Sequence, residues 1–170
     1  MNFPLLPTVI VNAATDITPA LLQTMNIRLL MLDFDNTIVP YTTNVPTEAM
    51  SDWLRQMRAS DIQLCVVSNS HKSRVKLFCQ AYDLPCITHA KKPFSRGIRQ
   101  CLEQFSQKPE NCALVGDQIF TDTLGANCTG VRSILVKAID NHTVWLKLRH
   151  VAEMPFIFAA RKRRIAHEKS

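Results

Sequence analysis

Three short apolar runs constrain the fold of this 170-residue chain more than any other feature. They are Leu29–Leu32, Leu64–Val67 and Ala113–Val115. Each run is apolar at every position and is followed at once by polar residues, which is typical of a strand buried on both faces of a sheet. Segments with helical spacing separate the runs. This alternation predicts a three-layer, Rossmann-like α/β fold in which helices cover both faces of a parallel sheet.

The remaining elements are expected from apolar periodicity and from capping residues. Thr18 and Thr47 are candidate N-caps, and Pro19 stands at a first helical position. We expect helices at about 18–25, 47–59, 70–82, 94–105, 121–127 and 142–150. We expect strands at about 28–34, 63–67, 85–88, 112–115 and 133–136. Residues 1–15 are apolar and contain prolines, and no element is assigned to them.

The composition gives no sign of a domain boundary. The net charge of +6 is uneven, because residues 161–164 read Arg-Lys-Arg-Arg. We therefore expect one domain over residues 1–170, with a basic tail at about 159–170. Such a tail suits nucleic acid, an anionic membrane surface or water alone.

The cysteines and the N-terminus bear on the compartment. The six cysteines show no C-x-x-C pairing, so we expect a reducing environment with neither disulfides nor a zinc site. No apolar stretch approaches the ~20 residues of a transmembrane helix. The first residues contain prolines and no basic segment, which is atypical of a signal peptide. We expect a cytoplasmic protein.

A pair of carboxylates follows the first apolar run. Asp33 and Asp35 stand two positions apart in the sequence Asp-Phe-Asp-Asn-Thr. Two carboxylates this close together raise each other's pKa unless a cation or hydrogen-bond donors offset their charges. A hard oxygen cluster suits Mg²⁺, and the carboxyl ends of parallel strands are where ligands bind in open α/β sheets. The pair alone fits a magnesium site or a polar turn with an Asx cap equally well.

Three later segments extend this pattern. The second run ends in Ser68-Asn69-Ser70, Lys91-Lys92-Pro93 precedes a predicted helix, and the third run ends in Gly116-Asp117-Gln118-Ile119-Phe120-Thr121-Asp122. In this order, the segments resemble the four motifs of the haloacid dehalogenase (HAD) superfamily of phosphotransferases. Together with Asp16-Ile17-Thr18-Pro19, they resemble the YqeG-type branch of subfamily IIIA, which is similar to the mitochondrial and plastid phosphatidylglycerophosphate phosphatases. The resemblance spans about residues 3–165.

The resemblance implies roles for the acidic residues. Asp33 would be the nucleophile that forms an aspartyl-phosphate, and Asp35 the general acid and base. Mg²⁺ would be held by the Asp33 carboxylate, the backbone carbonyl of Asp35, and Asp117. Asp122 would hold a metal-bound water or orient the set. Alternatively, Asp117 is a turn residue and Asp122 caps a helix.

Other motif residues would bind the phosphoryl group or shape the site. Ser68 would donate its hydroxyl to a phosphoryl oxygen, assisted by the backbone N–H of Asn69. Ser68 also fits a plain N-cap. Lys92 would neutralise the phosphoryl group, and is preferred to Lys91 because the lysine of the family usually precedes a proline. The remaining two motif residues, Asn36 and Thr37, would shape the loop.

The spacing of the motifs predicts no cap domain. The segment from Asp33 to Ser68 has room for one loop and one helix, and the segment from Ser68 to Lys92 for one helix and one short strand. An open site suits a substrate presented on something large: a macromolecule, a membrane lipid, or a cap from a second subunit. With the resemblance, this favours phosphatidylglycerophosphate as substrate and a peripheral position on the inner membrane face. Apolar residues near both ends either dock on the bilayer or close the core.

Two alternatives stay open. The first is a soluble sugar or nucleotide phosphatase whose cap comes from oligomerisation. The second is an RNA- or ribosome-associated protein whose HAD fold serves only binding. The paired aspartates favour an enzyme, because a binding protein needs no such pair.

Overall fold

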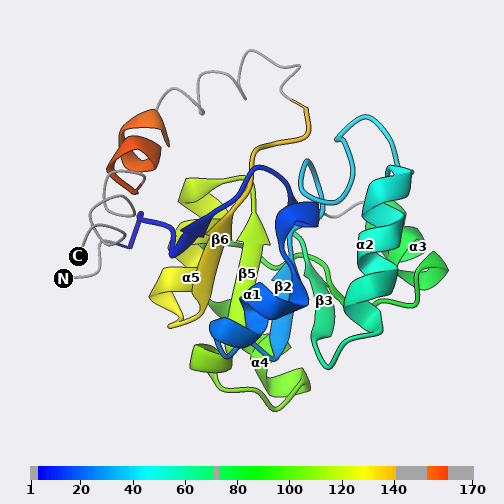
Figure 1. The fold of residues 1–170 in the computed structure, drawn as a ribbon, viewed down its shortest axis with the longest axis horizontal. Coiled ribbons are helices and arrows are strands. Elements are labelled where there is room, and N and C mark those ends of the chain that lie inside the picture. The colour runs from blue at the N-terminus through cyan, green and yellow to red at the C-terminus, as the bar shows by residue number, and fades with distance from the viewer. Residues whose placement is uncertain (1–3, 71–72, 141–152, 161–170) are drawn as a thin grey trace.

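Six strands form one parallel sheet at the centre of the computed structural model, which describes residues 4–70, 73–140 and 153–160 (Figure 1). Their spatial order is β1-β6-β5-β2-β3-β4. In chain order the strands are β1 (Val9–Ile10), β2 (Leu29–Leu32), β3 (Gln63–Val67), β4 (Cys86–Ile87), β5 (Cys112–Gly116) and β6 (Arg132–Leu135). The predicted parallel sheet is confirmed.

Helices connect the strands. They are α1 (Pro19–Thr24), α2 (Glu48–Arg58), α3 (Ser73–Ala81), α4 (Arg96–Gln104) and α5 (Leu124–Cys128), with short turns η1 (Ala14–Asp16), η2 (Pro109–Asn111) and the π-helical η3 (Ile119–Thr123). Residues 153–160 are also helical. The predicted caps are confirmed: the Thr18 and Thr47 hydroxyls accept hydrogen bonds from the backbone N–H groups of Leu21 and Met50, respectively.

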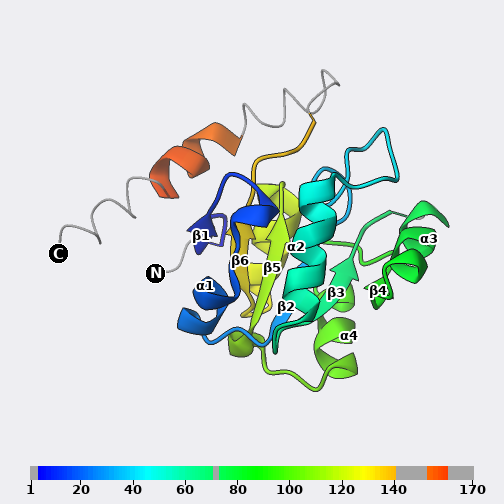
Figure 2. The same ribbon diagram turned by 45° about the vertical axis from the view of Figure 1, so that its right-hand side comes forward.

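Alternate residues of the central strands pack into two separate cores. Leu30 and Leu32 of β2 belong to the core covered by α1, α2 and α3, whereas Leu29 and Met31 belong to the core covered by α4 and α5. Because successive side chains point to opposite faces, a strand buried on both sides must be apolar throughout. The helices lie on both faces of the sheet in Figure 2, which confirms the three-layer fold.

The structure departs from the expected elements at β1 and at η3. Residues 9–10 form an edge strand paired with β6. This strand was not predicted, because two apolar residues in a proline-containing segment have no strand pattern of their own. The helix expected at 121–127 begins earlier, as η3 at Ile119. The helix expected at 142–150 lies outside the described residues, and of the one expected at 70–82 the structure shows Ser73–Ala81.

The apolar residues 9–11 and Phe158 differ in how they pack. Val9 and Val11 pack against the core, which favours the view that the N-terminal apolar residues close the sheet. In contrast, Phe158 is 73% exposed. Among the described helices, none is long and apolar enough to cross a membrane.

Candidate active site

The site lies where three neighbouring strands end. β2 stands between β3 and β5, with Leu32 paired to Val66 on one side and to Val115 on the other. The residues that follow these strands therefore meet at one edge of the sheet, although they are far apart in sequence. The backbone N–H of Asp33 continues the ladder by donating to the Val115 carbonyl at 2.9 Å.

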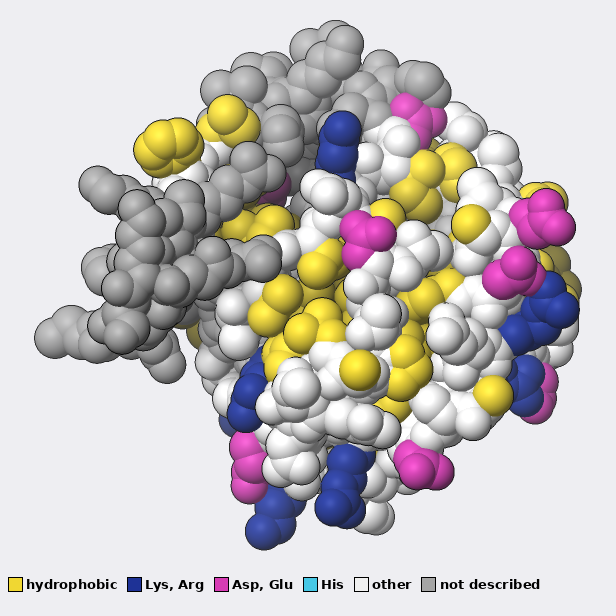
Figure 3. Space-filling view, viewed as in Figure 1, with side chains coloured by type: hydrophobic (Ala, Val, Ile, Leu, Met, Phe, Trp, Pro, Cys, Tyr) yellow, Lys and Arg dark blue, Asp and Glu magenta, His cyan; other side chains and the backbone are white. Residues whose placement is uncertain are grey.

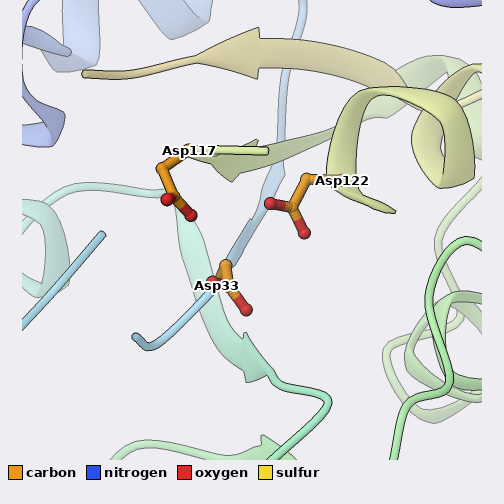
Figure 4. Close-up of side chains that lie close together, drawn as sticks. All are labelled: Asp33, Asp117 and Asp122. Atoms are coloured by element: carbon orange, nitrogen blue, oxygen red, sulfur yellow. The ribbon is translucent and has the colours of Figure 1, made fainter. Parts of the chain in front are cut away.

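Three buried aspartates gather at this edge. Asp33, Asp117 and Asp122 each offer a carboxylate oxygen, and these oxygens lie within 4.8 Å of one another. Figure 4 shows that Asp33 follows β2, that Asp117 follows β5, and that Asp122 approaches from the helical turn beyond it. Only hard oxygen ligands are present, at a spacing that one cation can bridge, so the residues fit Mg²⁺.

The turn after β5 places Asp122 in this cluster. Its Oδ2 accepts a hydrogen bond from the Gln118 backbone N–H at 3.1 Å. A Cβ at Gly116 would lie 2.3 Å from the Asp122 carboxyl carbon, so a residue with a side chain does not fit there unless the carboxylate moves. Asp122 is therefore built into the site, beyond the helix-capping role that its sequence position also allows.

Lys92 supplies the balancing charge. Its Nζ lies 2.7 Å from Asp33 Oδ1 and 2.7 Å from Asp122 Oδ1, and its side chain is 1% exposed. Both backbone polar groups of Lys92 bond to the Asn69 side chain: the N–H donates to Oδ1 at 2.7 Å, and the carbonyl accepts from Nδ2 at 2.8 Å. The neighbouring Lys91 is exposed. The structure thus buries Lys92 beside the acidic cluster, and its role in binding a phosphoryl group stays a prediction.

Burial and mutual charge set the ionisation of this group. Burial raises the pKa of Asp33 from 3.8 to about 6, against the opposing pull of Lys92 and with some help from Asp122. Burial alone would lower the pKa of Lys92, but the carboxylates of Asp122 and Asp33 outweigh it and raise that pKa above its ordinary value. Lys92 is therefore a permanent cation, and Asp33 is an anion at neutral pH.

The predicted loop residues shape the turn after β2. The Asn36 side-chain oxygen accepts a hydrogen bond from the Tyr41 N–H at 3.1 Å, and its carbonyl accepts from the Ile139 N–H at 3.0 Å. Asn36 has a positive φ of 62°, which asparagine tolerates better than most residues. Thr37 is buried beside it.

Two predicted phosphate-binding residues also make internal contacts. The buried Ser68 Oγ accepts a hydrogen bond from the Ser70 N–H at 3.1 Å, which is a local contact two residues along the chain. For Asn69, the prediction concerned the backbone N–H, whereas the structure reveals a side chain that fixes Lys92. The backbone carbonyl of Asp35 as a metal ligand stays a prediction.

Two residues near the site were not found from the sequence. Arg74 lies in the first turn of α3, and its Nη2 is 3.1 Å from Asp35 Oδ1. Glu153, from the helix at residues 153–160, is buried and accepts a hydrogen bond at its Oε1 from the Ile119 N–H at 3.0 Å, where η3 begins. An arginine on an amphipathic helix is typical of a solvated face, and nothing in the sequence links residue 153 to residue 119.

Comparison with known proteins identifies the family. The model of the family described as mitochondrial PGP phosphatase matches residues 3–139. The chain belongs to this family. A relative from Bacillus subtilis (strain 168), named "Probable phosphatase YqeG", is 34% identical over 131 residues, which are 77% of this chain and 76% of the relative. This HAD-superfamily protein of the YqeG type is thus a phosphatase, as the motifs predicted.

Solved structures share the fold. 3-Deoxy-D-manno-octulosonate 8-phosphate phosphatase from Yersinia pestis is 18% identical with a TM-score of 0.54, over 79% of this chain and 76% of that one. The cobalt-bound form of the corresponding Haemophilus influenzae enzyme (YrbI) is 12% identical with a TM-score of 0.53, over 74% of this chain and 75% of that one. At these identities the likeness supports the HAD fold alone.

Proposed function

We propose that this phosphatase hydrolyses phosphatidylglycerophosphate to phosphatidylglycerol through an aspartyl-phosphate on Asp33, with Mg²⁺ as cofactor. The observation that carries the mechanism is the buried cluster of Asp33, Asp117, Asp122 and Lys92 beside the ends of β2 and β5. Three carboxylates and one ammonium carry a net charge of −2, which one divalent cation would neutralise before an anionic phosphoryl group binds.

The chain's residues divide the chemistry between them. An Asp33 carboxylate oxygen forms a bond to phosphorus while the ester P–O bond breaks, and Asp35 gives its proton to the leaving alkoxide oxygen. Asp35 then takes a proton from water, the water oxygen attacks phosphorus, and the Asp33–phosphorus bond breaks to release inorganic phosphate. Lys92, with Ser68, stabilises the transferring phosphoryl oxygens. Mg²⁺ held by Asp33, the Asp35 carbonyl, Asp117 and, through water, Asp122 would supply further positive charge.

The open site and the family support a lipid substrate. Among the described residues, the segment from Asp33 to Ser68 holds a loop and α2, and that from Ser68 to Lys92 holds α3 and β4. No cap domain therefore covers the acidic cluster in this part of the chain. A lipid headgroup at a bilayer surface can reach such a site without the protein engulfing the acyl chains.

We further propose that the protein acts at an anionic membrane surface, on the inner face. Hydrophobic side chains stand at the surface over helix 153–160 (Figure 3), where Met154 is 49% exposed and Phe158 73% exposed. In sequence, the basic residues 161–164 follow directly, outside the described residues. Apolar and basic side chains in this order suit a headgroup interface.

A phosphate-release screen tests the substrate. Mixed micelles with phosphatidylglycerophosphate should give Mg²⁺-dependent release that EDTA abolishes and fresh Mg²⁺ restores. Faster turnover of soluble sugar or nucleotide phosphates than of the lipid would favour the soluble phosphatase instead. Co-purification of RNA, together with no phosphate release from any ester, would favour the binding protein.

A further inference from the structure

We propose that Arg74 is the positioning residue of the general acid and base, Asp35, and that it acts by holding the loop after β2 in place. The inference rests on the function proposed for Asp35. Arg74 is not among the motif residues, and its side chain is 11% exposed.

The guanidinium of Arg74 reaches three backbone carbonyls of that loop. Its Nη1 donates to the Tyr41 carbonyl at 2.6 Å, and its Nη2 donates to the carbonyls of Pro40 at 3.2 Å and Thr43 at 2.8 Å. These bonds join the first turn of α3 to residues 40–43, which lie 31 to 34 positions away in sequence. A guanidinium presents five N–H donors in one rigid plane, whereas an ammonium has three donors on a single atom, so a lysine would not reproduce this arrangement.

The same guanidinium faces the residues of the acidic pair. Its Nη2 lies 3.1 Å from Asp35 Oδ1, and its central carbon lies 5.1 Å from the centre of the Phe34 ring and 5.8 Å from that of Tyr41. Phe34 stands between Asp33 and Asp35 and is fully buried. Arg74 thus bears on the backbone and the carboxylate that set the direction of Asp35.

If Arg74 only positions the general acid, the effect of replacing it on the rate should depend on the leaving group of the substrate. The phosphoryl transfer to Asp33 needs a proton for a poor leaving group such as an alkoxide, but hardly any for a dinitrophenolate. Since kcat/KM reports the steps up to the first irreversible one, it isolates this transfer from the later attack by water. A displaced Asp35 should therefore lower kcat/KM for alkyl esters far more than for activated aryl esters.

The test compares Arg74→Met and Arg74→Lys with wild type on glycerol 3-phosphate and 2,4-dinitrophenyl phosphate. We expect Arg74→Met to lower kcat/KM for the alkyl ester on the order of 10²-fold, the scale of general acid catalysis, and to change the aryl ester by less than about 3-fold. Arg74→Lys keeps the charge but not the planar fork of donors, and its kcat/KM for the alkyl ester should fall between those of wild type and Arg74→Met.

Arg58→Met is the matched control. Arg58 likewise bonds a carboxylate, Asp83 at 2.7 Å, and a carbonyl, that of Tyr82 at 2.8 Å, but at the end of α2 away from the acidic cluster. This variant should leave both substrates unchanged. Chemical unfolding curves of all variants would establish that each variant is folded before its kinetics are compared.

The outcomes separate the positioning role of Arg74 from the assignment of Asp35 as the general acid. Asp35→Asn should show the same leaving-group discrimination as Arg74→Met. If Asp35→Asn discriminates but the Arg74 variants slow both substrates equally or neither, the positioning role is wrong while the assignment of Asp35 stands. If Asp35→Asn does not discriminate, the assignment of the general acid fails, and the role of Arg74 fails with it.

Discussion

Replacing Lys92 by methionine is the sharpest perturbation of the buried charge cluster. Methionine keeps an unbranched side chain but removes the ammonium, which lies 2.7 Å from an oxygen of both Asp33 and Asp122. Two buried carboxylates then lose the cation that they share. We expect the backbone of this loop to stay in place, because the Asn69 side chain bonds the main chain of residue 92.

The structure sets the size of the effect. Removing one partner of a buried ion pair costs about 3–5 kcal/mol, and one cation here serves two carboxylates, so we expect the upper half of that range in metal-free protein at pH 8. The cost should shrink at pH 5, because Asp33, whose pKa is about 6 even beside Lys92, then becomes protonated. Adding Asp122→Asn to Lys92→Met should recover part of the loss, since it removes one of the stranded charges.

Chemical unfolding in EDTA at the two pH values measures this, and phosphate release in Mg²⁺ measures the accompanying loss of turnover. Lys91→Met is the matched control: Lys91 is exposed, and its loss should stay within about 0.5 kcal/mol. A loss of less than about 1 kcal/mol for Lys92→Met, or one equal to that of Lys91→Met, would refute the shared-cation argument.

Three further perturbations test the rest of the site and the surface. Asp33→Asn should abolish phosphate release yet stay folded, and near wild-type release would exclude this nucleophile. The folded-state pKa of Asp33 is raised from 3.8 to about 6, so the metal-free wild type should lose up to about 3 kcal/mol of stability relative to this variant as pH rises across that window. Glu153→Ala strands the buried Ile119 N–H and should cost about 1–3 kcal/mol in chemical unfolding, whereas Glu153→Gln, which keeps an acceptor, should cost less; equal costs would contradict the capping role. Replacing the four basic residues 161–164 by glutamine should abolish low-salt sedimentation with phosphatidylglycerol vesicles and raise the KM for lipid without affecting aryl phosphate hydrolysis; unchanged sedimentation would sink the membrane role.

The edge strand and the turn after β5 show where sequence reasoning fails on the fold. β1 is two residues long and has no pattern of its own, because its position depends on pairing with Ile134 and Leu135. Likewise, η3 is π-helical over Ile119–Thr123, where the apolar spacing predicts only an α-helix that begins slightly later. In both cases a tertiary contact outweighs the local preference of a few residues.

The sequence alone determined the layers of the fold and the motif residues of the site. Strands buried on both faces must be apolar throughout, and polar residues directly after them must lie at one edge of a parallel sheet. Asp33 follows one apolar run directly and Asp117 follows another after Gly116, and the family resemblance predicted that the two carboxylates share a metal. The local order of Lys92 and Pro93, through resemblance, also selected the lysine that is buried.

Only the tertiary structure decided which side chains complete the cluster and orient it. Lys92 reaches Asp33 across 59 positions, and Glu153 reaches Ile119 across 34. Arg74 finds three carbonyls of a loop on a different element. Such contacts depend on how far one helix is turned and how one loop bends, and no periodicity records either. The types of residue in the motifs thus determine which reaction the site can perform. The relative positions of their side chains are set by long-range contacts that form only when the layers pack.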